Sequence, residues 1–204
     1  MRAFDQAMTE ELTRGIQEVE AVSGVEVVVR VAPQSGSYRD VSLLTGIVVG
    51  LTVLLTAIYG PFVVSDQWLI VDVLVLGGLA VWTTGRLNPV VRWLTTHVRR
   101  QQQVELGAQQ NFVTHCVSAT KERTGVLVYT SVLEEAIWVL PDFGAEGAAP
   151  ESEWAALRRL GAEHPGDLPA RLLAVLEQLK PLSERYIPRD VDDVNELPDA
   201  PSIG

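Results

Sequence analysis

The sequence is poor in the residues on which many active sites depend. It has one cysteine and three histidines among 204 residues. The single thiol, Cys116, excludes an intramolecular disulfide and suits a reducing compartment. His97 and His164 have no metal-ligating partner at a useful spacing. No phosphate-binding loop, Cys-x-x-Cys pair, Ser-His-Asp arrangement or dinucleotide fingerprint occurs. The sequence therefore carries no complete motif of these enzyme classes.

Positive charge is also scarce. The chain has 16 Lys and Arg against 26 Asp and Glu, which gives a formal net charge of -10. Nonspecific nucleic-acid binding requires a basic face. The composition therefore argues against a nucleic-acid partner.

Two long segments are almost free of charge. Val41–Val64 has no charged side chain, and Trp68–Gly85 has only Asp72. A bilayer core of ~30 Å needs about 20 apolar helical residues, so each segment is long enough to span it. The three-residue linker at 65–67 predicts a transmembrane hairpin with spans 41–64 and 68–85. The first segment is too long, and begins too late, for a signal peptide.

The distribution of arginine predicts the orientation of this hairpin. Arg30 and Arg39 precede it, Arg86 begins the segment that follows it, and the linker has no Lys or Arg. Positive residues favour the cytoplasmic side. We therefore expect a multi-pass protein of the bacterial inner membrane with both termini in the cytoplasm. Asp72 lies about one turn inside the second span, where it can reach water, and one carboxylate does not make a transport pathway.

A basic, partly aromatic stretch follows the second span. It contains Arg86, Arg92, Trp93, Arg99 and Arg100. One interpretation is an amphipathic segment that lies on an anionic membrane surface. The other is the first turns of a domain helix, in which the arginines only set the topology.

Small residues follow a regular spacing in the first span. Ser42, Gly46 and Gly50 are four residues apart and allow close approach of another helix. They can pack against Gly77 and Gly78 of the same hairpin, or they can mediate self-association. The sequence leaves both alternatives open.

The soluble segments indicate an α/β domain that the hairpin interrupts. One helix and one strand before the hairpin cannot form a core alone, so their partners must follow it. The expected parts are 1–40, 41–85, 86–186 and an acidic, Pro-rich tail at 187–204, which its composition predicts to be disordered or loosely docked.

The expected elements have a simple order. The first two strands would pair in parallel, and the third would be antiparallel to the second. The apolar patterns predict helices at 9–24, 89–123, 151–160 and 168–181, strands at 25–31, 126–130 and 136–140, and a loop at 141–150.

A series of motifs runs along the soluble part of the chain, at 12–29, 110–112, 120–131 and 133–144, with Trp154 and the end segment 193–199. In this order they resemble the TPM domain family, which is named for thylakoid, photosystem-repair and receptor-modulator proteins. The resemblance implies a three-layer α/β/α fold with a small mixed sheet. Some family members are described as acid phosphatases, some bind a divalent metal, and others assist membrane complexes.

Two local patterns resemble parts of catalytic motifs. Six residues lie between Cys116 and Arg123, one more than a tyrosine-phosphatase loop has. Cys116 also shares an apolar helical stripe with Phe112, which predicts a buried core thiol. Asp142-Phe143-Gly144 matches the metal-binding motif of kinases, but no other kinase motif is present.

Asp142 is nevertheless a carboxylate at the end of a predicted strand. With Glu134, Glu135 or Glu146 it could hold a divalent cation through oxygen ligands. The alternative is an exposed aspartate in a turn.

Two functions therefore remain. The first is a non-catalytic interaction or assembly module for a membrane complex, with the lipid bilayer and a membrane protein or a second copy as partners. The second is a metal-dependent phosphatase that uses carboxylates near Asp142.

Overall fold

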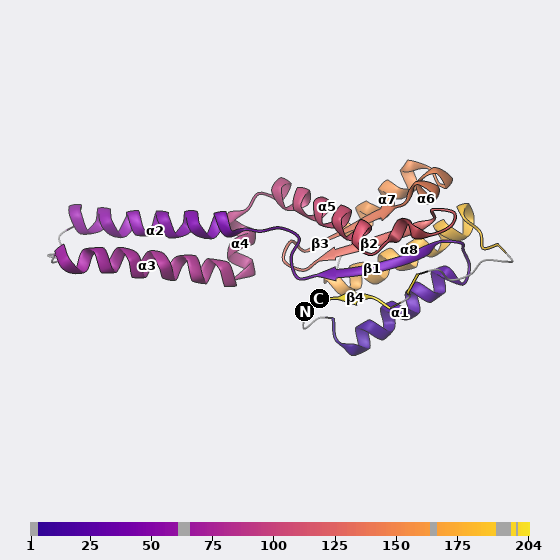
Figure 1. The fold of residues 1–204 in the computed structure, drawn as a ribbon, viewed down its shortest axis with the longest axis horizontal. Coiled ribbons are helices and arrows are strands. Elements are labelled where there is room, and N and C mark those ends of the chain that lie inside the picture. Colours follow the sequence, from indigo (N-terminus) through magenta and orange to yellow (C-terminus); the bar gives the residue numbers. More distant parts are fainter. Residues whose placement is uncertain (1–3, 61–65, 164–166, 191–196, 199) are drawn as a thin grey trace. The chain divides into compact units, whose positions relative to one another are not determined.

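The computed structural model describes residues 4–60, 66–163, 167–190, 197–198 and 200–204. The fold is mixed α/β (Figure 1). It consists of two compact units, one formed by residues 1–35 and 101–204 and the other by residues 36–100.

A small mixed sheet organises the first unit. Its strands are β1 (Glu26–Ala32), β2 (Gly125–Ser131), β3 (Ala136–Pro141) and β4 (Ser202–Ile203), in the order β3-β2-β1-β4. β1 pairs with β2 in parallel, and β2 pairs with β3 antiparallel, which confirms both expected pairings. β4 adds a short parallel strand at the β1 edge.

One face of the sheet carries the larger core. Helices α1 (Gln6–Glu20), α7 (Glu151–Glu163) and α8 (Leu168–Tyr186) cover this face. The sheet contributes alternate residues such as Val27, Val29 and Val31, as expected for the pleat of a strand. Trp154 of α7 is fully buried in this core.

The opposite face is covered by α5 (His97–Thr114), from Gln101 onward (Figure 1). Val104 and Ala108 pack there against Leu127 and Tyr129. Gly107 is required at the closest approach, because a Cβ atom on it would lie 2.8 Å from the Tyr129 hydroxyl.

The long helix expected after the hairpin is broken. It consists of α4 (Asn88–Leu94), α5 and a 3-10 turn, η1 (Val117–Ala119). Cys116 stands between α5 and η1 in a left-handed conformation with φ 51. Its side chain is exposed, so the prediction of a core thiol was wrong, and Val117 fills the buried position instead.

Three features of the C-terminal part also differ from expectation. The predicted loop after β3 contains α6 (Phe143–Ala148), and part of the tail forms β4. α8 continues through Pro181 to Tyr186 rather than ending there. The buried side chains of Leu179 and Leu182 flank Pro181, so core packing carries the helix past the hydrogen bond that proline removes.

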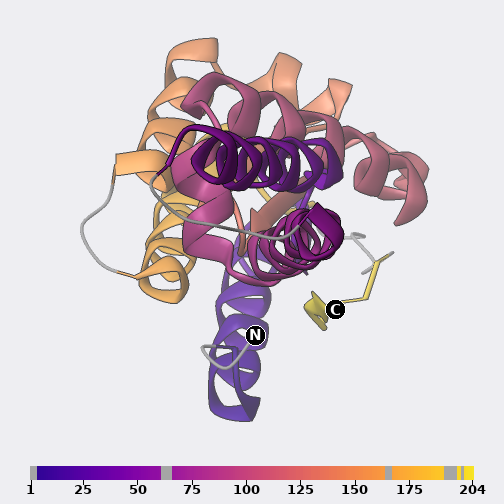
Figure 2. The ribbon, with the colours of Figure 1, turned by 90° about the vertical axis from the view of Figure 1, so that its left-hand side faces the viewer.

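The second unit is dominated by a pair of apolar helices, α2 (Arg39–Tyr59) and α3 (Asp66–Arg86), which lie side by side (Figures 1 and 2). Each is long and apolar enough to cross a membrane. α3 begins at Asp66, so two of the three expected linker residues are helical. The predicted end of the first span at 61–64 lies outside the described residues.

Candidate functional site

Close contact between backbones holds the two apolar helices together. Ser42, Gly46 and Gly50 are the buried residues of α2. A Cβ atom on Gly46 would lie 2.9 Å from the Gly77 carbonyl oxygen and would overlap Val81 Cγ2. A Cβ atom on Gly77 would in turn lie 3.1 Å from the Gly46 carbonyl oxygen. The small residues therefore face the inside of the hairpin.

Gly78 has a different environment from the other predicted packing residues. A Cβ atom there would have no neighbour within 4 Å. Of the two sequence interpretations, packing within the hairpin accounts for Ser42, Gly46, Gly50 and Gly77. Gly78 lies outside this contact.

The outer surface of the hairpin is aliphatic. Only 17% of the most apolar stretch of α2, and 11% of that of α3, is buried inside the protein. Soluble proteins rarely expose large contiguous apolar patches, and such a belt is typical of a surface that contacts a membrane or another protein. The belt of α2 and α3 includes Leu43, Leu44, Ile47, Val48, Leu51, Leu55, Ile58, Ile70, Val71, Leu74, Val75, Leu76 and Leu79.

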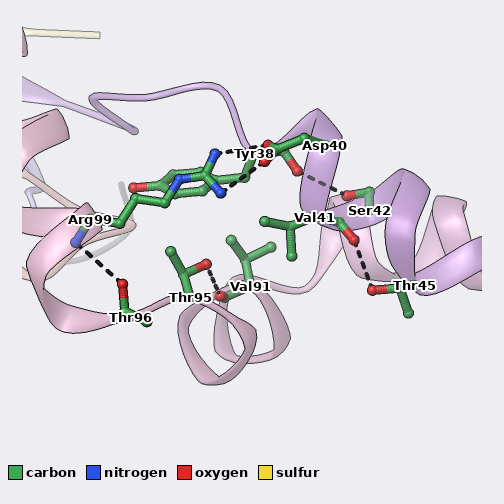
Figure 3. Close-up of polar contacts among 9 residues, drawn as sticks. All are labelled: Tyr38, Asp40, Val41, Ser42, Thr45, Val91, Thr95, Thr96 and Arg99. Atoms are coloured by element: carbon green, nitrogen blue, oxygen red, sulfur yellow. Dashed lines mark hydrogen bonds and ion pairs between the residues drawn. The ribbon is translucent and has the colours of Figure 1, made fainter. Parts of the chain in front are cut away.

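A cluster of polar side chains lies at the start of α2 (Figure 3). Arg99 donates to both oxygens of Asp40, at 2.9 Å and 2.8 Å. Its guanidinium lies over the Tyr38 ring, 5.6 Å from the centroid. The hydrogen bond that Arg99 donates to Asp40 raises the pKa of Arg99, so the guanidinium stays charged. Arg99, predicted as a membrane-surface residue, is therefore held within its own unit.

Two threonine hydroxyls near this cluster donate hydrogen bonds to backbone carbonyl oxygens four residues earlier in the chain (Figure 3). Thr45 Oγ1 donates to the Val41 carbonyl oxygen at 2.8 Å, and Thr95 Oγ1 donates to that of Val91 at 2.5 Å. Such backbone hydrogen bonds let a hydroxyl lie in apolar surroundings at little cost.

The other predicted surface residues have varied environments. Arg86 stacks on the Trp82 ring at 4.7 Å from the centroid. Trp93 is 84% exposed, and Arg92 and Arg100 are half-buried. Asp72 is exposed on α3, so it does not line the contact between the two helices.

The candidate metal ligands do not come together. Glu134 and Glu135 follow the Ser131 end of the β2–β3 pair, whereas Asp142 follows the opposite end. Five residue steps separate the two ends, about 17 Å at ~3.3 Å per residue. Within the described part of the chain, no three His, Cys, Asp or Glu side chains could hold one metal ion.

Asp142 has a structural role. It is 5% exposed, and it caps α6 by accepting a hydrogen bond from the Phe143 amide at 2.8 Å. Its Oδ2 also accepts from Arg123 Nε at 3.2 Å. The expected alternative of an exposed turn aspartate was therefore wrong as to exposure. Glu146, in the first turn of α6, is exposed.

Glu134 is a buried carboxylate, and it does not lie near Asp142 as a shared metal site would require. Both of its oxygens accept from the Ser35 amide, at 3.1 Å and 3.2 Å, and one also accepts from the Ser131 hydroxyl. Ser35 in turn bonds the Tyr129 hydroxyl at 3.0 Å. Burial raises the pKa of Tyr129, so the phenol stays protonated at neutral pH. The cluster fixes the chain segment that leaves β1, and no sequence motif marks it.

Replacing Asp142 tests its structural role. Asp142→Ala is expected to lower the free energy of unfolding by about 1 kcal/mol, because the N-cap is lost. Asp142→Asn keeps a capping oxygen, and its lost ion pair involves an Arg123 side chain that is 58% exposed, so we expect a smaller loss. Urea denaturation followed by circular dichroism measures both. Greater loss in the Asn variant than in the Ala variant would contradict the capping role.

Comparison with known proteins shows a similarity of fold. No protein-family model and no curated protein sequence matches the chain. A solved structure that is similar is the NMR structure of BA42 protein from the psychrophilic bacterium Bizionia argentinensis, with a TM-score of 0.59 and 15% identity. The match covers 98% of this chain and 94% of that one. At this identity the likeness establishes the fold alone.

Proposed function

We propose that this is a two-pass membrane protein whose α/β unit is a non-catalytic interaction or assembly module for a membrane complex. The observation that carries the proposal is the apolar outer belt of α2 and α3, which only a bilayer or another apolar partner can cover. The arginines at 39, 86, 92, 99 and 100 favour an orientation with both termini in the cytoplasm.

We further propose that residues 1–35 and 101–204 form a TPM-type domain. In support, the resembling segment at 12–29 contains most of α1 and of β1, and the one at 120–144 contains β2 and β3; these three strands are neighbours in one sheet. Helices also cover both faces of that sheet, as a three-layer α/β/α fold requires.

The charge distribution supports different roles for the two units, one in contact with lipid and the other in contact with protein partners. Residues 36–100 contain five arginines and three aspartates, a net charge of +2, so the remainder of the chain carries -12. An acidic unit is repelled by an anionic leaflet, whereas the arginines near the helix ends are attracted to it. The α/β unit would then be presented to partners in the cytoplasm rather than to lipid.

No observation favours the phosphatase alternative. Asp142 is occupied by the α6 cap and by Arg123, and the glutamates at 134 and 135 lie at the other end of the hairpin of strands.

Membrane integration is tested with the full chain expressed in bacteria. We expect the protein to stay in the pellet after alkaline carbonate extraction. Reporter fusions to both termini should report the cytoplasm. A variant with Leu51→Arg and Leu74→Arg places two charges on the outer belt and should shift most of the protein to the supernatant or to degradation, because each central arginine costs about 2.5–3.5 kcal/mol.

A matched control places arginine at exposed positions outside the spans, at Gln102 and Gln110. This variant should remain in the pellet. Extraction of the unmodified protein by carbonate would reject the membrane proposal.

A further inference from the structure

The two ends of the helical hairpin carry opposite charge. We call the end where α2 begins and α3 finishes the base of the hairpin, formed by residues 38–43 and 82–100, which include α4 (Figure 1). Ser42 of α2 lies beside Gly85 of α3, so these two helix ends are at one level. The base has five arginines against one aspartate, a net charge of +4. Asp66 and Asp72 lie in the first two turns of α3, toward the other end. Positive charge is therefore concentrated at the base.

Two arginines of the base have no carboxylate to neutralise them. Asp40, the single acidic residue of the base, is already bound by Arg99 at 2.9 Å and 2.8 Å. Arg39 and Arg86 are exposed, and neither forms an ion pair within the part of the chain that the structure describes. Arg86 lies over the Trp82 ring, and this stacking leaves the N–H groups in the plane of the guanidinium available to an anion. The base therefore has two guanidiniums that can donate to an anionic group.

The base also exposes large apolar side chains outside the two apolar helices. Trp93 of α4 is 84% exposed, and Leu87, Leu94 and Val98 are exposed as well. Val91 lies two residues before Trp93, on the opposite side of α4, and is buried where α4 contacts α2 and α3. Tryptophan at the end of an apolar helix is typical of the membrane–water interface, where its ring lies among the headgroups. The exposed side of α4 therefore suits this interface better than it suits water.

A phospholipid of negative net charge has a group for each of these features. Leu43 of the outer belt lies one turn beyond Arg39, and Leu79 lies two turns before Arg86. Acyl chains that cover this belt therefore end at the level of the two guanidiniums, where the headgroup phosphate would lie. Arginine binds phosphate oxygens through two parallel hydrogen bonds. A soluble anion carries the charge but has no group for the exposed apolar side chains.

We propose that the base of the hairpin binds the phosphate of an anionic phospholipid through Arg39 and Arg86, with the Trp93 ring among the headgroups and the acyl chains along the outer belt. A zwitterionic lipid has the same phosphate, but its cationic headgroup is repelled by the net charge of +4 at the base. The site therefore distinguishes anionic from zwitterionic lipid. This inference rests on the proposed membrane function and names the lipid partner of the hairpin.

Brominated lipids test this preference, because bromine quenches the fluorescence of a tryptophan that it contacts. The full chain carrying Trp68→Phe is reconstituted into phosphatidylcholine vesicles, so that Trp82 and Trp93 are the exposed tryptophans of the described residues. A small, equal fraction of the lipid is replaced by brominated phosphatidylglycerol in one series and by brominated phosphatidylcholine in the other. We expect the relative binding constant to favour phosphatidylglycerol about fivefold, the factor that one arginine contributes at an anionic surface.

Paired substitutions locate the preference. Arg39→Gln with Arg86→Gln should bring the binding constants of the two lipids close to equality. Arg14→Gln with Arg159→Gln is the matched control, because it removes the same charge from exposed positions of the α/β unit. This control should keep the fivefold ratio. Inorganic phosphate in the buffer, compared with chloride at equal ionic strength, should also leave the ratio unchanged.

The contrary outcomes separate this inference from the membrane proposal. Equal quenching by the two lipids, measured before any arginine is changed, overturns the lipid preference alone, whatever the arginine variants do. A preference that persists in the variant lacking Arg39 and Arg86 places the recognition elsewhere, and one that inorganic phosphate abolishes assigns the site to a soluble anion. Quenching by neither lipid would show that the hairpin does not contact a bilayer, and both proposals would fail together.

Discussion

Trp154→Ala is expected to lower the free energy of unfolding of the α/β unit by about 3–5 kcal/mol, the usual range when a buried aromatic side chain is truncated. Trp154 is 0% exposed and lies in the core between the sheet and helices α7 and α8. The neighbouring Leu157 and Leu172 belong to the same cluster and cannot fill a cavity of this size without leaving their own contacts. The denaturation midpoint in urea, followed by near-UV circular dichroism, measures the effect.

Trp154→Phe is the matched control. The indole Nε1 of Trp154 has no hydrogen-bond partner among the described residues, so its removal sacrifices no protein hydrogen bond. Phenylalanine keeps most of the apolar volume, and we expect a loss below about 1.5 kcal/mol. Equal destabilisation by the two substitutions would contradict the cavity explanation, because phenylalanine leaves a much smaller cavity than alanine does.

Local patterns predicted the three main strands correctly. The valine-rich β1 and β2 are buried on both faces, so their apolar runs are continuous and easy to recognise. β4 could not be predicted, because a two-residue strand has no period. Its place is determined by Arg30 and Val31, which lie more than 170 residues away in sequence.

The position of Cys116 shows why helix continuation is difficult to predict. The apolar stripe through Phe112 continued in the sequence to Cys116. The structure ends α5 at Thr114, and the left-handed residue at 116 turns the chain so that Val117 becomes the buried one. Periodicity alone contains no information about such a change of direction.

The candidate site was partly visible in the sequence. Length and lack of charge identified the two apolar helices. The spacing of Ser42, Gly46 and Gly50 marked one face of α2 for close contact, but it left open whether the partner is α3 or a second copy of the chain. Which of Gly77 and Gly78 faces α2 depends on the rotation of α3 about its axis, and the sequence does not give that rotation. The acidic residues were misleading because Glu134 and Glu135 are close to Asp142 in sequence, but β3 lies between them and places them at its opposite ends.

Gly46→Val is expected to separate α2 from α3. The added side chain would meet Val81 Cγ2 and the Gly77 carbonyl oxygen, and a backbone atom cannot move aside without displacing its helix. Overpacking of this kind typically costs about 1–3 kcal/mol. Gly78→Val is the matched control, because the same group added there meets no atom within 4 Å. It should leave the hairpin unchanged.

A designed disulfide reports the separation directly. A Cβ atom on Gly85 would lie 3.6 Å from Ser42 Oγ, so Ser42→Cys with Gly85→Cys should cross-link readily in a Cys116→Ser background. We expect several-fold slower cross-linking with Gly46→Val and an unchanged rate with Gly78→Val. If Gly78→Val instead disrupted association between differently tagged copies, the outer glycine would serve a contact between molecules. The inner glycines would then be confined to packing within each hairpin, and self-association would have to occur through the opposite face of α3.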